Sequence, residues 1–430
     1  MLTRLDLRTP AGADWRSSLP RPQLGKDSGV AAVRAILADV RDHGDAAVRE
    51  YTERFDGVRL ESLRVPADEV GAALGAVAPE FRQALEAASE SILAFHHHQL
   101  LGDSHYERDG VAVRELRRPM DRAGLYVPGG RARYPSTVLM TAIPARVAGV
   151  PELVLCVPPE AGGTVAAPTL AAAALAGVDE IYRIGGAQAV AAMAYGTETI
   201  RPVDVVVGPG NLYVAEAKRQ VAAEGVVGVP APFAGPSEVV VVADEATPVT
   251  WAAIDVVVQA EHGPDGLAWL VTWSEGAADA ISAEVSRLVA ASPRRHDIEA
   301  TLAEGGYAVV VDGPEQAMEV ANAIAPEHLE IMSADPEALV PLVRHAGAVF
   351  CGPYSPASVG DYLAGPSHVL PTYGSARFAG ALRVDDFVKT VHVITVDQPG
   401  LARVAPHVAA LAEAEGLAAH AESVRLRWAR

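Results

Sequence analysis

The sequence predicts an α/β protein with two blocks of parallel sheet and a helical segment in front of them. Short apolar runs alternate with Ala-rich helical stretches from about residue 123 to 244, and further runs follow up to about residue 370. Gly-rich turns follow two of the runs, where α/β folds place their ligands. The chain has 430 residues, 50% of them hydrophobic, so we expect two to four domains.

The first hundred residues have the apolar spacing of amphipathic helices. One helix is predicted for 27–55, starting at Asp27 and Ser28, and another for 79–99. The second helix ends in three consecutive histidines, His96–His98. Consecutive helical positions point in different directions, so these side chains cannot all face one ion. We interpret them as a solvated helix end.

Eight apolar runs predict the strands of the two blocks. They span 152–158, 180–186, 204–210 and 238–244 in the first block, and 266–273, 307–313, 328–332 and 347–353 in the second. After Gly374 the run VKTVHVITV precedes an Ala- and Leu-rich C-terminal helix. The turn GPGNLYV has only the first two glycines of the dinucleotide-binding fingerprint, so the sequence lacks that fingerprint.

Charge and composition exclude several classes of partner. The formal net charge of −19 repels phosphate backbones, so we expect no nucleic-acid partner. The longest soft apolar run, 165–178, is short and Ala-rich, which favours a packed helix over a membrane span. The N-terminus lacks the apolar region of a secretory signal. Cys156 and Cys351 lie in apolar runs and are interpreted as small buried side chains, which suits a cytoplasmic protein.

Two segments carry candidate catalytic or metal-binding side chains. In IDVVVQAEH, Gln259 and His262 are three residues apart and share one face of a predicted helix that breaks at Gly263. Histidine is a common zinc ligand and an amide oxygen a rarer one, so a helix end bonded to a loop stays open as the alternative. Glu327 and His328, adjacent at a predicted strand start, could offer two proton-transfer groups to one cleft or serve as a cap and a core residue.

Further candidates lie near the C-terminus and before one strand. Asp361 and His368 occupy a Gly/Pro-rich loop, which suits metal binding, substrate binding or loop capping. Glu415 and His420 lie five residues apart on the C-terminal helix, about 140° around its axis, so one ion could not easily bind both. Ser237 precedes a strand, where its hydroxyl could contact a ligand or cap the turn.

Nine segments, in order along the chain, closely resemble the histidinol dehydrogenase family. They are GLYVPGG, YPSTVLMTAIPARVAGV, GGAQAVAAMAYGTETI, VVGPGNLYVAEAKRQV, AGPSEVVVVAD, VVVQAEHGPDG, APEHLEI, SVGDYLAGPSHVLPT and DFVKTVHV. The resemblance runs from about residue 20 to the C-terminus and is densest from Ala123 to Thr390. Nine motifs in the family's order make it very specific.

The resemblance implies two incomplete Rossmann-like α/β domains in an intertwined homodimer. The implied divisions are an N-terminal arm at 1–25, a main α/β domain at 26–122 plus 239–372, an inserted NAD domain at 123–238, and a C-terminal dimerisation segment at 373–430. The incomplete NAD domain is in keeping with the missing fingerprint. In this arrangement Glu415 and His420 would reach the active site of the other subunit, so only one of them needs to bind the metal.

The resemblance also implies the reaction and the residues that perform it. The family oxidises L-histidinol to L-histidine, the last step of histidine biosynthesis, with two NAD⁺ and one zinc ion per active site. The implied zinc ligands are Gln259, His262, Asp361 and His420. The implied substrate contacts are Ser237, Gln259, His262, His328, Asp361, His368, Glu415 and His420, and the implied NAD contacts are Tyr126, Gln188 and Asn211. His328 would take the alcohol proton, and Glu327 would activate water for the aldehyde step.

The chain departs from the family pattern at two places, and rival functions stay open. Ser367 stands where the family has asparagine, and Arg131 and Arg133 add charge near the expected NAD. One rival is a dehydrogenase for another small polar alcohol. Another is a hydrolase that uses Glu327 with zinc-bound water, and a third is a metal-stabilised binding protein. The retained ligand and substrate positions favour histidinol.

Overall fold

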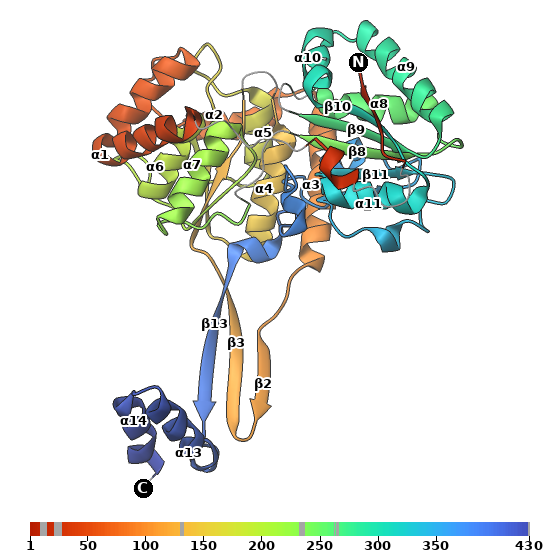
Figure 1. The fold of residues 1–430 in the computed structure, drawn as a ribbon. Helices are drawn as coiled ribbons and strands as arrows, with labels where there is room; N and C mark the ends of the chain where they lie inside the picture. Colours follow the sequence, from red (N-terminus) through yellow and green to blue (C-terminus); the bar gives the residue numbers. More distant parts are fainter. Residues whose placement is uncertain are drawn as a thin grey trace.

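The computed structural model describes residues 1–8, 15–20, 28–129, 133–231, 237–261, 263 and 266–428. Within these residues the chain forms two α/β units and a long arm that projects away from both (Figure 1). The predicted α/β class with parallel sheets is confirmed. His262 and Arg131, both named above, lie outside the described residues.

The first unit is built on a six-stranded sheet in which all neighbouring strands are parallel. In spatial order its strands are β1 (Thr3–Asp6), β10 (Gly306–Val310), β9 (Leu267–Thr272), β8 (Glu238–Ala243), β11 (His328–Met332) and β12 (Ala348–Cys351). One face packs against α8 (Val249–Ala260), α9 (Glu275–Ala291) and α10 (Arg295–Gly305), and the other against α11 (Pro314–Ile324). The short helix α12 (Ala357–Tyr362) follows β12.

The second unit is built on a four-stranded parallel sheet. In spatial order its strands are β6 (Glu180–Tyr182), β5 (Glu152–Cys156), β4 (Arg122–Tyr126) and β7 (Val205–Val207). Its crossover helices are α4 (Pro135–Ala148), α5 (Ala167–Leu175), α6 (Gly186–Tyr195) and α7 (Leu212–Ala223). The strands are buried on both faces, as expected for a sheet covered by crossover helices.

The N-terminal helices also cover this second sheet. They are α1 (Ser28–Asp56), α2 (Ala67–Ala76) and α3 (Pro79–His98). The core residues of α1 join those of α6 and α7, whereas α2 and α3 join α4 and α5 on the other face. This packing differs from the expected grouping of 26–122 with 239–372, because an amphipathic pattern shows that a helix has a partner but not which sheet the partner is.

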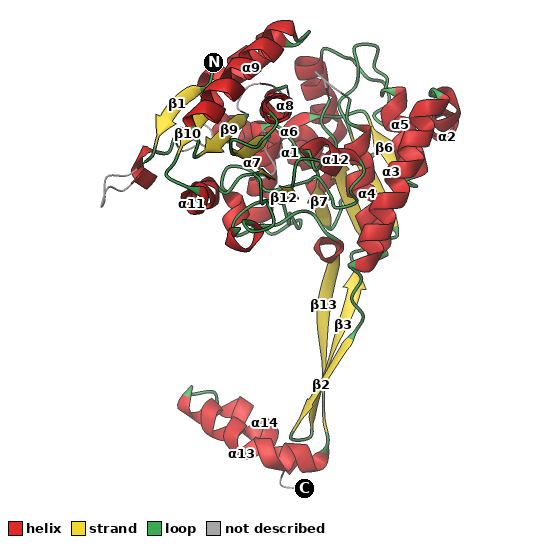
Figure 2. Ribbon diagram, turned by 90° about the vertical axis from the view of Figure 1, so that its right-hand side faces the viewer, coloured by secondary structure: helices red, strands yellow, loops and turns green. Residues whose placement is uncertain are grey.

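The arm combines two distant parts of the chain in one antiparallel sheet, β13–β3–β2. Its strands are β2 (Ser104–Arg108), β3 (Val111–Pro119) and β13 (Val388–Val396), and it carries α13 (Gln398–Ala414) and α14 (Ala418–Trp428) at its far end (Figure 2). The sequence predicts a single C-terminal helix, and this prediction is wrong because the segment forms two helices. Gly416, with φ of +74°, lies between α13 and α14, in a conformation that favours glycine after a helix.

Two further predictions from the sequence, for the three histidines of α3 and for the two cysteines, can be compared with the structure. His96 is fully buried, and its Nδ1 lies 2.8 Å from the carbonyl oxygen of Ile92, so only His97 and His98 fit the predicted solvated helix end. Cys156 and Cys351 lie on β5 and β12; Cys156 is buried as expected, whereas Cys351 is only half-buried, so the prediction of a buried side chain is wrong for Cys351. Burial raises the pKa of both thiols, so neither is an activated thiolate.

Candidate active site

The Glu327–His328 pair lies at the amino end of β11, and both side chains are buried. The neighbouring strand β8 holds the pair through one residue. The backbone N–H of Glu238 donates to Glu327 Oε2 at 2.9 Å, and His328 Nδ1 donates to the Glu238 carbonyl oxygen at 3.0 Å. Because a carbonyl oxygen only accepts, Nδ1 carries the hydrogen. In the neutral ring Nε2 is therefore the basic nitrogen of His328.

Gln259 and Asp361 approach this imidazole from different elements. Gln259, in the last turn of α8, has its Nε2 3.4 Å from His328 Nδ1. Asp361, in α12, has its Oδ1 3.5 Å from His328 Nε2. Asp361 therefore lies on a helix and not in the loop that the sequence predicts. The structure brings together two of the four expected ligands around the expected base.

Two carboxylates control the charge of His328. Burial lowers its pKa, but Glu327 and Asp361 oppose burial and prevail, so the pKa of His328 lies well above its usual value. The single chain thus favours the protonated ring. A divalent cation at Gln259 and Asp361 would oppose that shift and leave the ring free to accept a proton.

His368 lies next to Asp361 in the same cavity. Its Nδ1 donates to the Asp361 carbonyl oxygen at 2.9 Å, so its Nε2 accepts a hydrogen bond from the Thr137 hydroxyl at 3.0 Å. Burial lowers the pKa of His368 and favours this neutral ring. Ser367, the departure from the family pattern, donates to the Met140 carbonyl oxygen at 3.0 Å and so anchors the loop.

Three of these functional candidates line a cavity of about 510 Å³ between β11, β12 and α12. His328, Asp361 and His368 provide its polar part, and Phe350 stacks against the His328 ring with centroids 5.8 Å apart. Ser237 directly precedes β8, next to Glu238, which holds the Glu327–His328 pair. The cavity therefore extends from the amino end of β11 along the edge strand β12 and combines an imidazole, a carboxylate and an aromatic wall.

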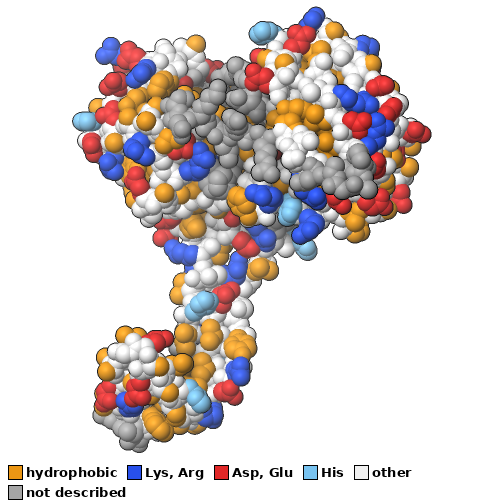
Figure 3. Space-filling model, in the orientation of Figure 1, with side chains coloured by type: hydrophobic (Ala, Val, Ile, Leu, Met, Phe, Trp, Pro, Cys, Tyr) orange, Lys and Arg blue, Asp and Glu red, His pale blue; other side chains and the backbone are white. Residues whose placement is uncertain are grey.

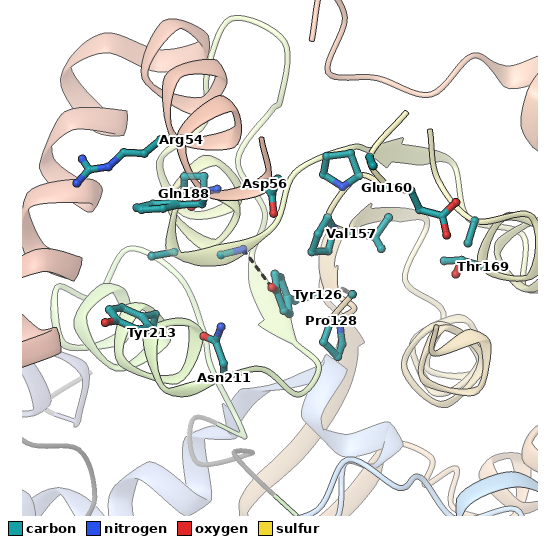
Figure 4. A pocket seen from close by; sticks show the side chains of 18 of the residues that line it. Arg54, Asp56, Tyr126, Pro128, Val157, Glu160, Thr169, Gln188, Asn211 and Tyr213 are labelled. Atoms are coloured by element: carbon teal, nitrogen blue, oxygen red, sulfur yellow. Dashed lines mark hydrogen bonds between the residues drawn. The ribbon is translucent and has the colours of Figure 1, made fainter. Parts of the chain in front are cut away.

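Tyr126, Gln188 and Asn211 line one separate pocket of about 1340 Å³ (Figure 4). Tyr126 ends β4, Gln188 follows β6 in the first turn of α6, and Asn211 follows β7 as the residue that caps α7. The pocket thus lies at the carboxyl edge of the four-stranded sheet. Ligands of open α/β sheets bind at this edge, where helix N-termini favour negatively charged groups.

Hydrogen bonds hold Tyr126 and Asn211 in place, whereas the amide of Gln188 has no partner among the described residues. The Tyr126 hydroxyl accepts from the Gly186 N–H at 3.1 Å, and Asn211 Oδ1 accepts from the Val214 N–H at 3.1 Å. Gly186 has φ of +64°, a conformation that favours glycine, and a Cβ there would lie 2.6 Å from Gln188 Oε1 and displace that amide. Among the described residues neither amide atom of Gln188 has a hydrogen-bond partner, although both are buried.

Charged groups complete this pocket. Arg133, another departure from the family pattern, pairs with Glu160 at 2.8 Å on the pocket wall, so its charge is neutralised. Beneath the pocket, the buried Lys218 of α7 donates from Nζ to the Gly208 carbonyl oxygen, in the turn that leads to Asn211. Burial lowers the pKa of Lys218 to about 7.

Glu415 and His420 do not join the cavity of their own chain. Both are exposed at the far end of the arm (Figure 1): His420 lies on α14, whereas Glu415 lies in the turn after α13 and not on the helix that the sequence predicts. Accordingly, no group of three or more His, Cys, Asp or Glu side chains able to hold a metal ion occurs within the part of the chain that the structure describes. Within the described chain, His420 therefore does not lie with the residues around His328.

Sequence reasoning missed four buried charged residues around these two sites. They are Lys218, Glu238, Asp255 and Glu330. Burial, together with the neighbouring Glu327, raises the pKa of Glu238 to about 8. The sequence feature that could have identified three of them is a single charged residue inside an apolar run, as in SEVVVV, AIDVVV and HLEIM. Such a charge is rarely buried without a specific partner.

The comparisons with known proteins agree over the full chain. A model of the histidinol dehydrogenase family matches residues 19–428. Histidinol dehydrogenase of Moorella thermoacetica is 48% identical over 407 residues, which cover 94% of this chain and 95% of that protein. The Rhizobium meliloti histidinol dehydrogenase is 49% identical over 400 residues, which cover 92% and 91%. The crystal structure of histidinol dehydrogenase from Elizabethkingia anophelis has a TM-score of 0.93 at 35% identity and covers 99% of this chain and 98% of that chain.

The chain matches these proteins over most of its length, has a base and a carboxylate at one cavity, and has a nucleotide-type pocket on a second sheet. Together these observations identify the protein as an α/β oxidoreductase. Within that class, the chain belongs to the histidinol dehydrogenase family.

Proposed function

We propose that the protein oxidises L-histidinol to L-histidine by way of the aldehyde, in the last step of histidine biosynthesis, with NAD⁺ and one zinc ion per active site. The observation that carries the proposal is the convergence of Gln259 and Asp361 on His328, beside Glu327, at a cavity that His328 and Asp361 line. These are residues that the family resemblance assigns to zinc and to proton transfer. A base next to a candidate metal position suits the oxidation of an alcohol.

The residues present fit a zinc ion. Among the described residues Gln259 Oε1 is buried and accepts no hydrogen bond, which is a costly state unless a ligand supplies a partner. Gln259 and Asp361 would hold the ion, with His262 of the same chain and His420 of a second copy. When bound, zinc would supply a positive charge that orients the substrate's nitrogen and alcohol groups.

The residues of the second pocket fit a dinucleotide. Gln188 offers two unsatisfied amide atoms, and Tyr126 and Asn211 flank them in a pocket large enough for such a ligand. NAD⁺ would supply the hydride acceptor for both oxidations. Because the pocket lies at the carboxyl edge of β4, β6 and β7, the N-termini of α6 and α7 can face a pyrophosphate.

Proton transfer in this proposal belongs to His328 and Glu327. His328 takes the alcohol proton at Nε2, because its Nδ1 hydrogen is committed to the Glu238 carbonyl oxygen. Glu327, held by the Glu238 N–H, activates the water that adds to the aldehyde, and His328 is again the base in the second oxidation. His368, Ser237 and the partner's Glu415 contact the substrate.

The arm supports a homodimer with shared active sites. It projects from the body and exposes large apolar side chains (Figure 3), including Ile394, Leu411 and Leu426, each more than 60% exposed in the single chain. An arm of this kind has few contacts of its own to stabilise it, and burial against another copy would cover it. In this proposal, residues 123–238 form the NAD domain and residues 373–430 form the dimerisation segment.

We also propose a cytoplasmic location without membrane or nucleic-acid partners. The two cysteines and the acidic surface support it. Among the described residues no helix is both long and apolar enough to cross a bilayer.

Turnover of histidinol tests the proposal. The zinc-loaded protein is expected to reduce two NAD⁺ for each histidinol converted to histidine, measured by the absorbance of reduced nicotinamide and by amino-acid analysis. A panel of other amino and sulfonated alcohols serves as the comparison. Turnover of another alcohol without turnover of histidinol would support the rival dehydrogenase. Zinc-dependent cleavage of an ester or amide substrate, with no reduction of NAD⁺ in the presence of histidinol, would support a hydrolase.

Replacing Lys218 with methionine is expected to weaken NAD⁺ binding by about tenfold. The change leaves the Gly208 carbonyl oxygen without its buried donor and loosens the turn that carries Asn211. Calorimetric titration with NAD⁺ measures the effect, and replacement of the exposed Lys389 by methionine is the control. An unchanged affinity would contradict the role assigned to Lys218.

The same variant tests the charge of Lys218. Its folded-state pKa is lowered from 10.5 to about 7, so between these values the unfolded chain binds the proton more tightly than the folded chain. The unfolding free energy of the wild type should therefore rise from pH 7 towards pH 10, relative to Lys218→Met. Denaturant unfolding at several pH values measures this difference, and a constant difference is the contrary result.

A further inference from the structure

Two buried carboxyl groups meet beneath the cavity, and the proposed reaction uses neither. Glu330 lies on β11 two residues after His328, so both side chains point to the sheet face that α8 covers. Asp255 lies on α8 one turn before Gln259. Glu330 is 1% exposed and Asp255 7%, and the two side chains share a hydrogen bond.

The pair requires a proton. Two ionised carboxylates only accept hydrogen bonds, so one of them must be protonated for them to bond to each other. Among the described residues neither side chain forms an ion pair with Lys or Arg, and Glu330 Oε2 has no other donor. Burial, followed by the neighbouring Asp255, raises the pKa of Glu330 to about 9, which agrees with a proton held at neutral pH.

The pair also connects the elements that build the cavity. Glu330 Oε1 accepts a hydrogen bond of 2.9 Å from the N–H of Ala357, the first residue of α12. Asp361 lies one turn further along that helix. The two carboxyl groups therefore join α8, β11 and α12, and each of these elements presents one residue of the site, namely Gln259, His328 or Asp361.

We propose that Asp255 and Glu330 form a proton-sharing carboxyl pair that positions Gln259, His328 and Asp361 relative to one another. The pair touches neither substrate nor metal, so both are positioning residues. A neutral or singly charged pair adds little repulsion beneath a site that already holds Glu327 and Asp361. The expected effect of the carboxyl pair on zinc binding rests on the proposed function, whereas the inference that the pair shares a proton does not rest on it.

Substitutions at Glu330 separate a shared proton from a needed charge. Glu330→Gln keeps an acceptor for the Ala357 N–H and offers a permanent donor to Asp255, so zinc affinity and kcat should stay within about threefold of wild type. Glu330→Leu removes both bonds and should lower zinc affinity by about 10- to 100-fold, the usual effect of losing an outer support of a metal site. Competition with a chromophoric chelator measures the affinity for Zn²⁺ alone.

Ala357→Pro provides a second test if Glu330→Leu does not fold. Proline is tolerated in the first turn of a helix and removes only the N–H that Glu330 accepts, so zinc affinity should fall while the carboxyl pair remains. Asp244→Asn is the matched control, because Asp244 is a buried carboxylate at the other end of β8 that accepts the N–H groups of Ala246 and Ala334. It should leave zinc affinity unchanged.

Infrared spectroscopy detects the proton directly. At neutral pH the difference spectrum between the wild type and the double variant Asp255→Asn, Glu330→Gln should contain the carbonyl band of a protonated carboxyl group, and any band of Glu238, whose pKa burial raises to about 8, cancels in that difference. Absence of the band from that difference, or equal damage by Glu330→Gln and Glu330→Leu, would overturn the proposal. Failure of the wild type to oxidise histidinol would instead overturn the proposed function, because the band and the Zn²⁺ titration need no substrate.

Discussion

Replacing His328 with asparagine is expected to lower kcat with histidinol by about 10²- to 10⁴-fold, the range usual for loss of a general base. Asparagine can still donate to the Glu238 carbonyl oxygen, so the strand pairing of β8 and β11 should persist. What disappears is the basic nitrogen that faces Asp361. Both oxidations should slow to a similar degree, because the same nitrogen serves as the base in each. Steady-state and single-turnover rates with histidinol and with the aldehyde measure the two steps.

Glu327→Gln is the informative comparison for His328→Asn. The amide keeps an acceptor for the Glu238 N–H but cannot activate water. Oxidation of the aldehyde should therefore fall more than oxidation of the alcohol. Equal losses in both steps would contradict the division of roles between the two residues. Absence of histidinol oxidation in the wild type, with ligand binding unchanged by Glu327→Gln, would favour the binding-protein alternative.

Mixed dimers are expected to regain activity that neither parent variant has. His328→Asn disables the site of its own chain, whereas His420→Ala disables the site to which its arm would contribute. A heterodimer of the two then has one site with both defects and one with none. Random pairing of equal amounts should restore about a quarter of the wild-type activity, because half of the dimers are mixed and each has one intact site.

Co-expression of differently tagged subunits produces the mixed dimers, and sequential affinity purification isolates them. The control combines His328→Asn with Glu327→Gln, which lie in the same half of the site, so each mixed dimer keeps a defect in both sites. Recovery with this control, or no recovery with His420→Ala, would show that the arm does not supply the missing ligand.

The regular elements follow closely from local patterns in the sequence. The run HLEIM predicts β11 with the bounds that the structure has, and the helices at 27–55 and 79–99 correspond to α1 and α3 within a residue. The short strand β1 was missed, because four mostly exposed residues at a sheet edge have no apolar alternation. The strands β2 and β3 were missed for a similar reason, since most of their residues are exposed or half-buried on the arm.

The site is harder to predict than the elements. Spacing places Gln259 on a helix face, but nothing local shows that Asp361, about a hundred residues away, approaches the same imidazole. Only the resemblance connected these residues. The positions of Glu238, Asp255 and Glu330 depend on which strand pairs with which, and that pairing is set by the whole fold.

Helix α4 lies between the two pockets. It begins two residues after Arg133, which lines the nucleotide-type pocket, and Thr137 in its first turn bonds to His368 in the catalytic cavity. Residues 137–145 of this helix are buried, so it can shift only as a stiff body. If α4 shifts when a ligand binds in one pocket, that shift also moves residues at the other pocket. By thermodynamic reciprocity, the factor by which dinucleotide changes substrate affinity must equal the factor by which substrate changes dinucleotide affinity.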